Sequence, residues 1–188
     1  MFPYCQHSLL TPPKCLGFQL RHFSLGHIDL LTALESPVVT GGVEQLNPAD
    51  TAAAVWVCTR SYERGVAQYT KNNQMVVFAM ASLGAKFGRK PADFAAQRDI
   101  FLEYLETYFM APPRWEGKPV EPVLPWHLSV FCALQRDTNY TPSEVWNMPL
   151  PRALELFAAT AANRGDDSLI PPNQQKIIDM MNSQGGEK

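Results

Sequence analysis

Charged side chains are scarce in this sequence, and its basic residues form no block. Asp, Glu, Lys and Arg make up 18% of the 188 residues, and the formal net charge is −2. Such a chain lacks the concentrated positive surface with which proteins attract nucleic-acid phosphates. No apolar run approaches the length of a membrane-spanning helix either. We therefore expect no nucleic acid and no membrane as partner, and the low charge favours a well-buried core or a surface reserved for other proteins.

Export signals and paired cysteines are also lacking. The first residues, MFPYCQHSLLTPPK, contain no charged start followed by an apolar stretch, so we expect no secretory signal peptide. None of the four cysteines belongs to a Cys-x-x-Cys pair. We expect a cytoplasmic protein whose thiols are reduced.

No short catalytic or cofactor-binding motif occurs. The sequence contains no G-x-S-x-G, no H-E-x-x-H and no G-x-G-x-x-G. The stretch GAKFGRK differs in spacing from a phosphate-binding loop, and Pro91 follows it, so we interpret it as the end of a helix. These absences predict a protein that is not an enzyme and binds no cofactor.

Residues that can ligate metals are present, but their spacing is poor. Cys5, His7 and Cys15 form one loose group, whereas structural zinc sites usually contain two tight pairs of ligands. A stripe of acidic residues has helical spacing, but no Glu-x-x-His occurs to complete a carboxylate metal site. We expect no metal and interpret the stripe as a solvated helix face. Its members are Asp99, Glu103 and Glu106.

Helical periodicity dominates the chain from residue 24 onward. Ser24, Asn47 and Pro91 are typical of helix starts. The helix that begins after Asn47 is expected to extend to about residue 69, and the apolar stretch 75–81 is expected to form a central, buried helix. We predict a mainly α fold, a compact bundle of about six to seven helices with a small N-terminal β element. Residues 1–168 are expected to form a single helical domain with an irregular N-terminal segment, and residues 169–188 an amphipathic C-terminal tail.

The β element is predicted from alternation near the N-terminus. In the stretch KCLGFQLRHF, the apolar residues Leu16, Phe18 and Leu20 alternate with less apolar neighbours. A period of two predicts a short strand with one buried face.

The stretch NYTPSEVWNMPLPRALELF contains residues that end and begin helices. Thr141 and Glu144 have the spacing of a capping box, and Pro142 stands at the first helical position. Pro149 and Pro151 are expected to end this short helix and to start the next one. Each of these residues has a structural role that requires no ligand.

Two segments are the candidates for partner binding. The proline-rich loop 111–125 contains Trp115 next to Arg114, and Trp and Arg are enriched among the residues that dominate protein interfaces. In the C-terminal tail, Ile177, Ile178 and Met181 fall on one side of a short amphipathic helix.

Two stretches carry a resemblance to a known class of proteins. YTPSEVWNMPLPRALELF and LRHFSLGHIDLLTALESPVVTGG resemble segments of small morphogenesis proteins of tailed phages and prophages. The resemblance covers about forty residues. It implies a soluble, mainly helical assembly factor, similar to tail assembly chaperones, that binds the tape-measure or tail-tube protein before polymerisation. Its location would be the host cytoplasm if a phage encodes it.

Two alternatives stay open beside this reading. The chain could be a structural virion or scaffold subunit, and a homo-oligomer is compatible with either role. It could also be a small metal-dependent or Cys/His enzyme that uses scattered residues, for instance His22, His27 and Cys58.

Overall fold

The computed structural model describes residues 11–41, 46–88, 91–109 and 124–165. Within these ranges the chain forms eight helices and one two-stranded antiparallel sheet near the N-terminus, which confirms the predicted mainly α fold with a small β element. The elements are β1 (Lys14–Cys15), β2 (Phe18–Gln19), α1 (Leu25–Ala33), α2 (Pro37–Thr40), α3 (Pro48–Cys58), α4 (Tyr62–Gly88), α5 (Pro91–Tyr108), α6 (Trp126–Asp137), α7 (Pro142–Asn147) and α8 (Leu150–Asn163).

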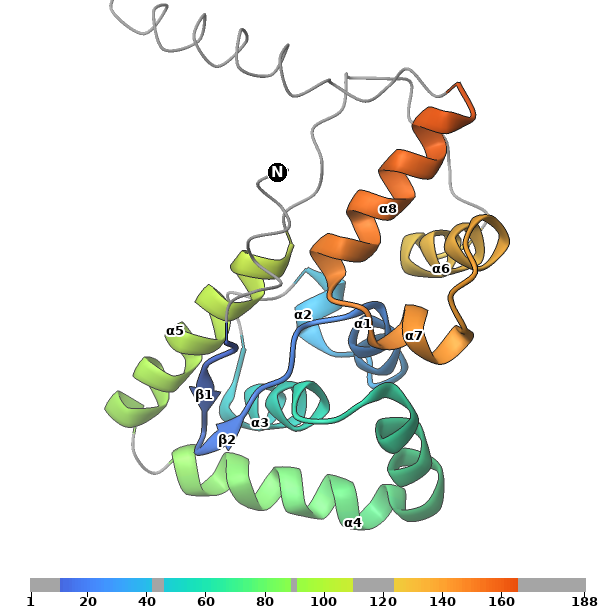
Figure 1. Cartoon of the computed structure of the whole chain (residues 1–188). Coiled ribbons are helices and arrows are strands. Elements are labelled where there is room, and N and C mark those ends of the chain that lie inside the picture. The colour runs from blue at the N-terminus through green and yellow to red at the C-terminus, as the bar shows by residue number, and fades with distance from the viewer. Residues whose placement is uncertain (1–10, 42–45, 89–90, 110–123, 166–188) are drawn as a thin grey trace, which may run out of the picture.

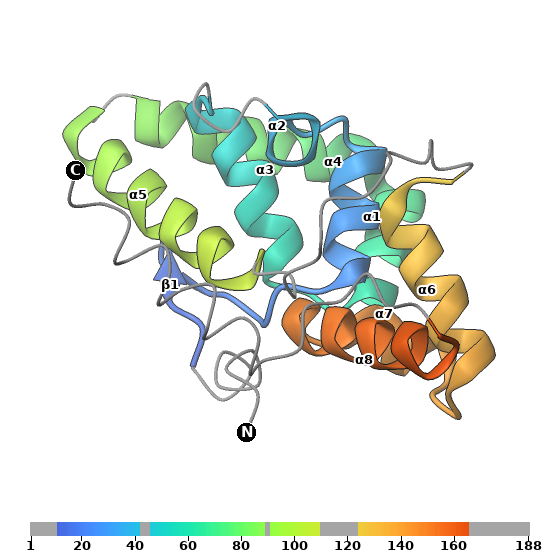
Figure 2. The same cartoon turned by 90° about the horizontal axis from the view of Figure 1, so that it is seen from above.

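The helices surround a centre formed by α1 and α3 (Figures 1 and 2). Helix α5 and the β hairpin lie on one side of this centre, and α6 lies on the opposite side. The largest fully buried side chains come from several of these elements and form one core cluster. They include Phe23, Leu25, Leu31, Val55, Phe101, Tyr108, Leu134 and Leu150.

The predicted strand across residues 16–20 is a tight hairpin instead. Leu16 and Gly17 have φ angles of 52° and 85°, so both occupy the left-handed region that a two-residue hairpin turn requires. The turn interrupts the alternation: Leu16 and Leu20 are buried, but Phe18 is 44% exposed. Gln97 of α5 holds the turn, because its Oε1 accepts a hydrogen bond of 2.6 Å from the Leu16 N–H.

The predicted helix starts are confirmed. Ser24 caps α1 in a reciprocal box with His27, and the Oδ1 of Asn47 accepts hydrogen bonds from the first turn of α3. Thr141 and Glu144 form the expected capping box of α7, with Pro142 in its first turn. Capping depends on residues within one turn of each other, so it is visible in sequence.

The chain after Asn47 departs from the prediction. Helix α3 ends at Cys58, and α4 begins at Tyr62 and continues through the region that was expected to form a separate helix. Side chains complete the hydrogen bonding at the end of α3, because Thr59 Oγ1 and Arg60 Nη1 donate to the carbonyl oxygen of Trp56 at 2.8 and 2.9 Å. The side chains of residues 75–80 lie outside the part of the chain that is described, and Ala81 is exposed.

Gly65 permits a close helix crossing. A Cβ at this position of α4 would lie 2.5 Å from Cδ1 of Leu30 in α1. Gly26 of α1 is equally crowded, because a Cβ there would lie 2.7 Å from the Tyr62 Cβ and 2.9 Å from the Trp146 carbonyl oxygen. The absence of a side chain at both positions allows α1, α4 and α7 to approach one another.

Candidate functional site

A groove lies where α1, α2, the end of α5 and the start of α6 meet. Its volume is about 240 Å³. We call it the Trp126 groove and define it by the residues that line it: Ile28, Thr32, Val38, Val39, Phe109, Pro125, Trp126 and His127. Most of this lining is apolar. The hydroxyl of Thr32 makes a hydrogen bond within its own helix, because its Oγ1 donates to the Ile28 carbonyl oxygen at 2.8 Å.

Two aromatic side chains in the groove are unusually exposed. Phe109 is 42% exposed and Trp126 is 43% exposed, and Leu124, close to Trp126 in sequence, is also exposed. The Phe109 ring packs on the buried ring of Phe23 with 5.2 Å between centroids, so the core fixes one of its sides. Large apolar side chains gathered at a concave surface are typical of sites that a partner or ligand covers.

Local turns position the α1–α2 wall of the groove. Ser36 caps the one-turn helix α2, and its own N–H donates to the carbonyl oxygen of Leu31 at 2.9 Å. Glu35 before it adopts a φ of 50°, which turns the chain sharply between the two helices. The turn brings Val38 and Val39 beside Ile28.

His127, which lines the groove, belongs to a series of polar contacts that links α6, α1 and α4. The ring is almost fully buried, and its Nε2 lies 3.4 Å from Asp29 Oδ1 of α1. The other carboxylate oxygen of Asp29 accepts a hydrogen bond of 2.8 Å from the hydroxyl of Tyr62 in α4. Burial, and then the hydrogen bond to Asp29, raise the pKa of the Tyr62 hydroxyl.

The tautomer of His127 decides what the ring offers beside its contact with Asp29. When Nε2 donates its proton to Asp29, Nδ1 carries the lone pair and is a hydrogen-bond acceptor. Among the described residues, Nδ1 has no hydrogen-bond partner. In that tautomer the ring, which lines the groove, has one acceptor without a partner among the described residues.

The first turn of α6 contains backbone N–H groups that make no hydrogen bond within the described ranges. The residue before the helix is Pro125, which makes no side-chain capping bond. Its carbonyl oxygen accepts from the N–H groups of Leu128 and Ser129. The preceding N–H groups of Trp126 and His127 have no partner within the described ranges, as expected for the first turn of an uncapped helix.

An aromatic stack joins α7 to α6 and α4. Trp146 stacks on Phe131 of α6 with 4.1 Å between centroids and on Tyr62 of α4 with 4.7 Å. Val145 and Met148 of the same segment are buried. The segment around α7 therefore acts as a packed joint, which agrees with its interpretation as structural.

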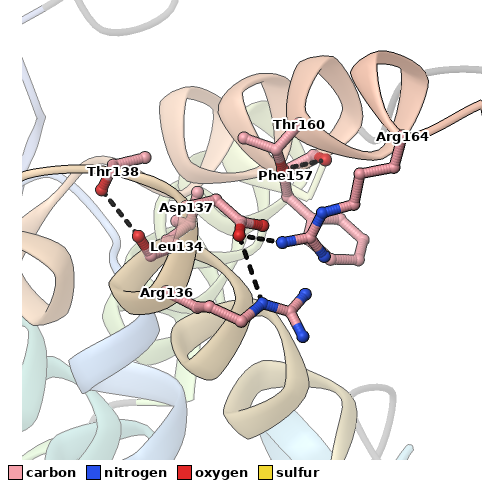
Figure 3. Close-up of polar contacts among 7 residues, drawn as sticks. All are labelled: Leu134, Arg136, Asp137, Thr138, Phe157, Thr160 and Arg164. Carbon is pink, nitrogen blue, oxygen red and sulfur yellow. Dashed lines mark hydrogen bonds and ion pairs between the residues drawn. The ribbon is translucent and has the colours of Figure 1, made fainter.

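A polar cluster joins the far ends of α6 and α8 (Figure 3). Asp137 Oδ1 accepts from Arg136 Nε at 3.2 Å and from Arg164 Nη2. Asp137 Oδ2 is buried and has no hydrogen-bond partner among the described residues. The cluster fixes α8 to α6 at the end of α6 that is remote from Trp126.

The partner-binding residues predicted from sequence lie elsewhere. Trp115 and Arg114 of the proline-rich loop, and Ile177, Ile178 and Met181 of the tail, fall outside the described residues, so their roles stay predictions. The one part of the expected loop 111–125 that is described, Leu124 and Pro125, adjoins or lines the groove. The one sequence signal for the groove was Trp126 beside Pro125. The segments that line the groove around Trp126 are distant in sequence, so their meeting could not be predicted.

The residues suggested for a Cys/His or metal site are occupied by structural contacts. His27 contacts Ser24 through Nδ1 and the Arg60 carbonyl oxygen through Nε2, and burial lowers its pKa to about 4. His22 Nδ1 lies 2.7 Å from the Tyr108 hydroxyl, while burial raises the pKa of the Cys58 thiol. In the part of the chain that the structure describes, no three His, Cys, Asp or Glu residues are arranged to hold a metal ion.

Comparisons with protein-family models, curated proteins and solved structures find no match for this chain. Among the helices in the described ranges, none combines the length and apolar character needed to cross a membrane.

Proposed function

We propose that this chain is a non-enzymatic assembly factor that binds a protein client at the Trp126 groove. In this proposal it resembles a tail assembly chaperone of a phage or prophage, and its client is the tape-measure or tail-tube protein in the host cytoplasm. The observation that carries the proposal is the exposure of Phe109 and Trp126 in one apolar groove.

The composition of the groove supports a protein partner. Interfaces concentrate their binding energy in a few aromatic residues, and Trp is the most enriched of these. Fixed walls favour binding as well, because side chains that are already ordered lose little freedom when a partner arrives. Here Val38 and Ile28 are buried, and the core supports Phe109.

The two stretches that carry the phage resemblance are neighbours in the fold. Ser24, just before α1, forms a bridge with Pro149, just before α8. The Leu150 N–H donates to the Phe23 carbonyl oxygen at 2.7 Å. The first stretch also supplies Ile28 and Val38 of the groove. The resemblance therefore falls on one contiguous part of the molecule, and that part supplies the α1–α2 wall of the groove.

Binding to the products of the neighbouring genes tests this function. The full chain is purified and titrated with any tape-measure or tail-tube protein that the genes beside its own encode. We expect saturable binding to at least one of them, and light scattering should show a small oligomer of the chain alone. Failure to bind either protein would contradict the proposal, and large or closed assemblies of the chain alone would favour a structural scaffold subunit.

A further inference from the structure

We propose that the C-terminal tail of this chain docks in the Trp126 groove through residues 177–181, and that a client displaces it. The docking concerns the chain alone and goes beyond the proposed function, whereas the displacement rests on that function. Three observations carry the inference: an apolar groove that the described residues leave uncovered, the place at which the described chain ends, and the length of chain that follows.

The groove is open and its lining is uncharged. Within the described ranges, Phe109 and Trp126 remain 42% and 43% exposed. None of the eight lining residues is Lys, Arg, Asp or Glu. An occupant that removes these aromatic rings from water is favoured by the hydrophobic effect. The occupant should therefore be apolar and should carry little charge into the groove.

The exposed area of the two rings favours a segment of the same chain over a second copy. Since Phe and Trp side chains bury about 150–250 Å² each, these exposed fractions leave roughly 200 Å² or less to cover. A stable interface between separate proteins buries about 800 Å² on each partner. A segment of the same chain needs a smaller contact, because its attachment gives it a high effective concentration at the groove.

An ion pair at the far end of α6 fixes where the C-terminal tail begins. Arg164, which follows α8, contacts Asp137, the last residue of α6 (Figure 3). Gly165 comes next and is the last residue that the structure describes. Because a helix rises 1.5 Å per residue, Asp137 and Trp126 at the two ends of α6 are roughly 17 Å apart. The tail therefore starts beside one end of α6, and the groove lies at the other end.

The chain that follows Gly165 is long enough to reach the groove. Twelve residues lead from Gly165 to Ile177. Twelve extended residues span at most about 40 Å, and an unstructured chain of the same length has an end-to-end distance of about 20 Å. Both distances exceed the length of α6. Residues 177–181 can therefore meet Trp126 while α8 stays in place.

The composition of the tail matches the groove. Residues 177–181 lie outside the described residues, but their sequence contains one charge, Asp179, and four large apolar side chains. The apolar residues are Ile177, Ile178, Met180 and Met181. Met side chains adapt to irregular apolar surfaces. The loop 110–123 begins and ends beside the groove, but its charged residues and prolines alternate throughout, so it provides no comparable apolar run.

The exposure of Trp126 in the full chain tests the docking. The chain is labelled with fluorotryptophan, Trp126→Phe assigns the resonance, and the solvent isotope shift between light and heavy water measures the exposure of the ring. The double variant Ile177→Asp, Met181→Asp should increase this shift at Trp126. Gln174→Asp, Gln175→Asp is the control, because it adds the same charge outside the apolar run. Equal exposure of Trp126 in the wild-type chain and in the Ile177→Asp, Met181→Asp variant would overturn the proposal.

A capped peptide of residues 173–183 tests whether the groove is the binding site. It should bind the Ile177→Asp, Met181→Asp variant about three- to tenfold more tightly than the wild-type chain, in which the attached tail competes. Adding Thr32→Glu to this variant places a carboxylate in the groove and should abolish binding. Ala33→Glu is the matched control, because Ala33 is also exposed on α1 but does not line the groove. Binding that ignores Thr32→Glu, or that is equal in the wild-type chain and the double variant, would contradict the docking.

The same measurements identify other occupants. If the exposure of Trp126 falls as the protein concentration rises, a second copy covers the groove. If Trp115→Ala exposes Trp126 and the double variant of the tail does not, the loop 110–123 covers it. Either result would overturn the proposal.

Titration with the client separates this inference from the proposed function. A tape-measure or tail-tube protein should bind the double variant of the tail more tightly than the wild-type chain, by the same factor as the peptide. If the tail docks but neither protein binds, the proposed function fails and the docking stands. If one of them binds both chains equally, the displacement is wrong and the proposed function stands.

Discussion

The N–H of Leu150 donates a hydrogen bond of 2.7 Å to the carbonyl oxygen of Phe23. This bond connects the chain just before α1 with the first residue of α8, more than a hundred residues later in sequence. Both side chains are fully buried in the core. The wall of the Trp126 groove that α1 provides is therefore anchored to the C-terminal helices.

Enlarging Gly26 should destabilise the fold. Gly26→Ala would place a Cβ 2.7 Å from the Cβ of Tyr62 and 2.9 Å from the Trp146 carbonyl oxygen. Forcing these helices apart is expected to lower the free energy of unfolding by about 1–3 kcal/mol. Urea denaturation measures the change. Unchanged stability would show that α1, α4 and α7 do not approach as closely as described.

Removing the cap of α7 should have a smaller effect. Thr141→Ala removes the hydroxyl that accepts from the Glu144 N–H, and the free energy of unfolding should fall by about 0.5–2 kcal/mol. Glu144→Gln is the matched control, because Gln at this position also completes a capping box. Equal stabilities of Thr141→Ala and the wild-type chain in urea would show that Thr141 does not act as a cap.

The stability of the chain should decrease in mild acid because of His27. Burial lowers the pKa of His27 to about 4, below the value of 6.5 expected for an unfolded chain. The unfolded chain therefore binds the proton more tightly. The stabilisation by neutral His27 is complete above about pH 6.5 and is lost as the pH falls toward 4, by roughly 3 kcal/mol in total.

His27→Gln isolates this contribution. Gln at the third helical position retains the reciprocal cap with Ser24 but does not titrate. The free energies of unfolding of both proteins are measured in urea between pH 7 and pH 4. We expect the wild-type curve to fall more steeply than that of the variant. Parallel curves would show that His27 is not held neutral in the fold.

Loss of the Arg164 side chain should loosen the end of α8 without unfolding the protein. Arg164 and Asp137 are partly exposed, and such pairs contribute about 0–1 kcal/mol. Arg164→Ala should therefore increase hydrogen exchange of the Ala161, Ala162 and Asn163 amides and leave the first turns of α8 protected. Arg164→Lys, which keeps the charge, should show an intermediate effect. Uniform loss of protection along α8 would contradict this local role.

Local chemistry explains which features could be predicted from sequence. The starts of α1, α3 and α7 follow from caps such as Ser24, Asn47 and Thr141, whose partners lie within three residues. The hairpin was missed because Leu16 occupies the left-handed region, which a bulky residue rarely adopts. The end of α3 at Cys58 was missed because its last turn is completed by the side chains of Thr59 and Arg60 rather than by a glycine or proline.

The groove could not be predicted because its parts are distant in sequence. His127 and Asp29 are in contact although 98 residues separate them, and Trp126 and Val38 line the groove from different helices. Sequence identified the neighbouring proline-rich loop as a candidate for binding but gave no reason to connect its end with α1 and α2. Only the packing of α1, α5 and α6 brings these side chains to one place.

The affinity of the client for Trp126→Ala tests the central claim most directly. Phe18→Ala is the control, because Phe18 is as exposed as Trp126 but lies in the hairpin on the opposite side of the molecule from α6. Calorimetric titration with whichever tail protein binds the wild-type chain gives the three dissociation constants. We predict that Phe18→Ala binds as the wild-type chain does and that Trp126→Ala binds at least about 30-fold more weakly, as expected for a dominant interface residue. Equal affinities of Trp126→Ala and Phe18→Ala for that client would contradict the assignment of the groove as its binding site.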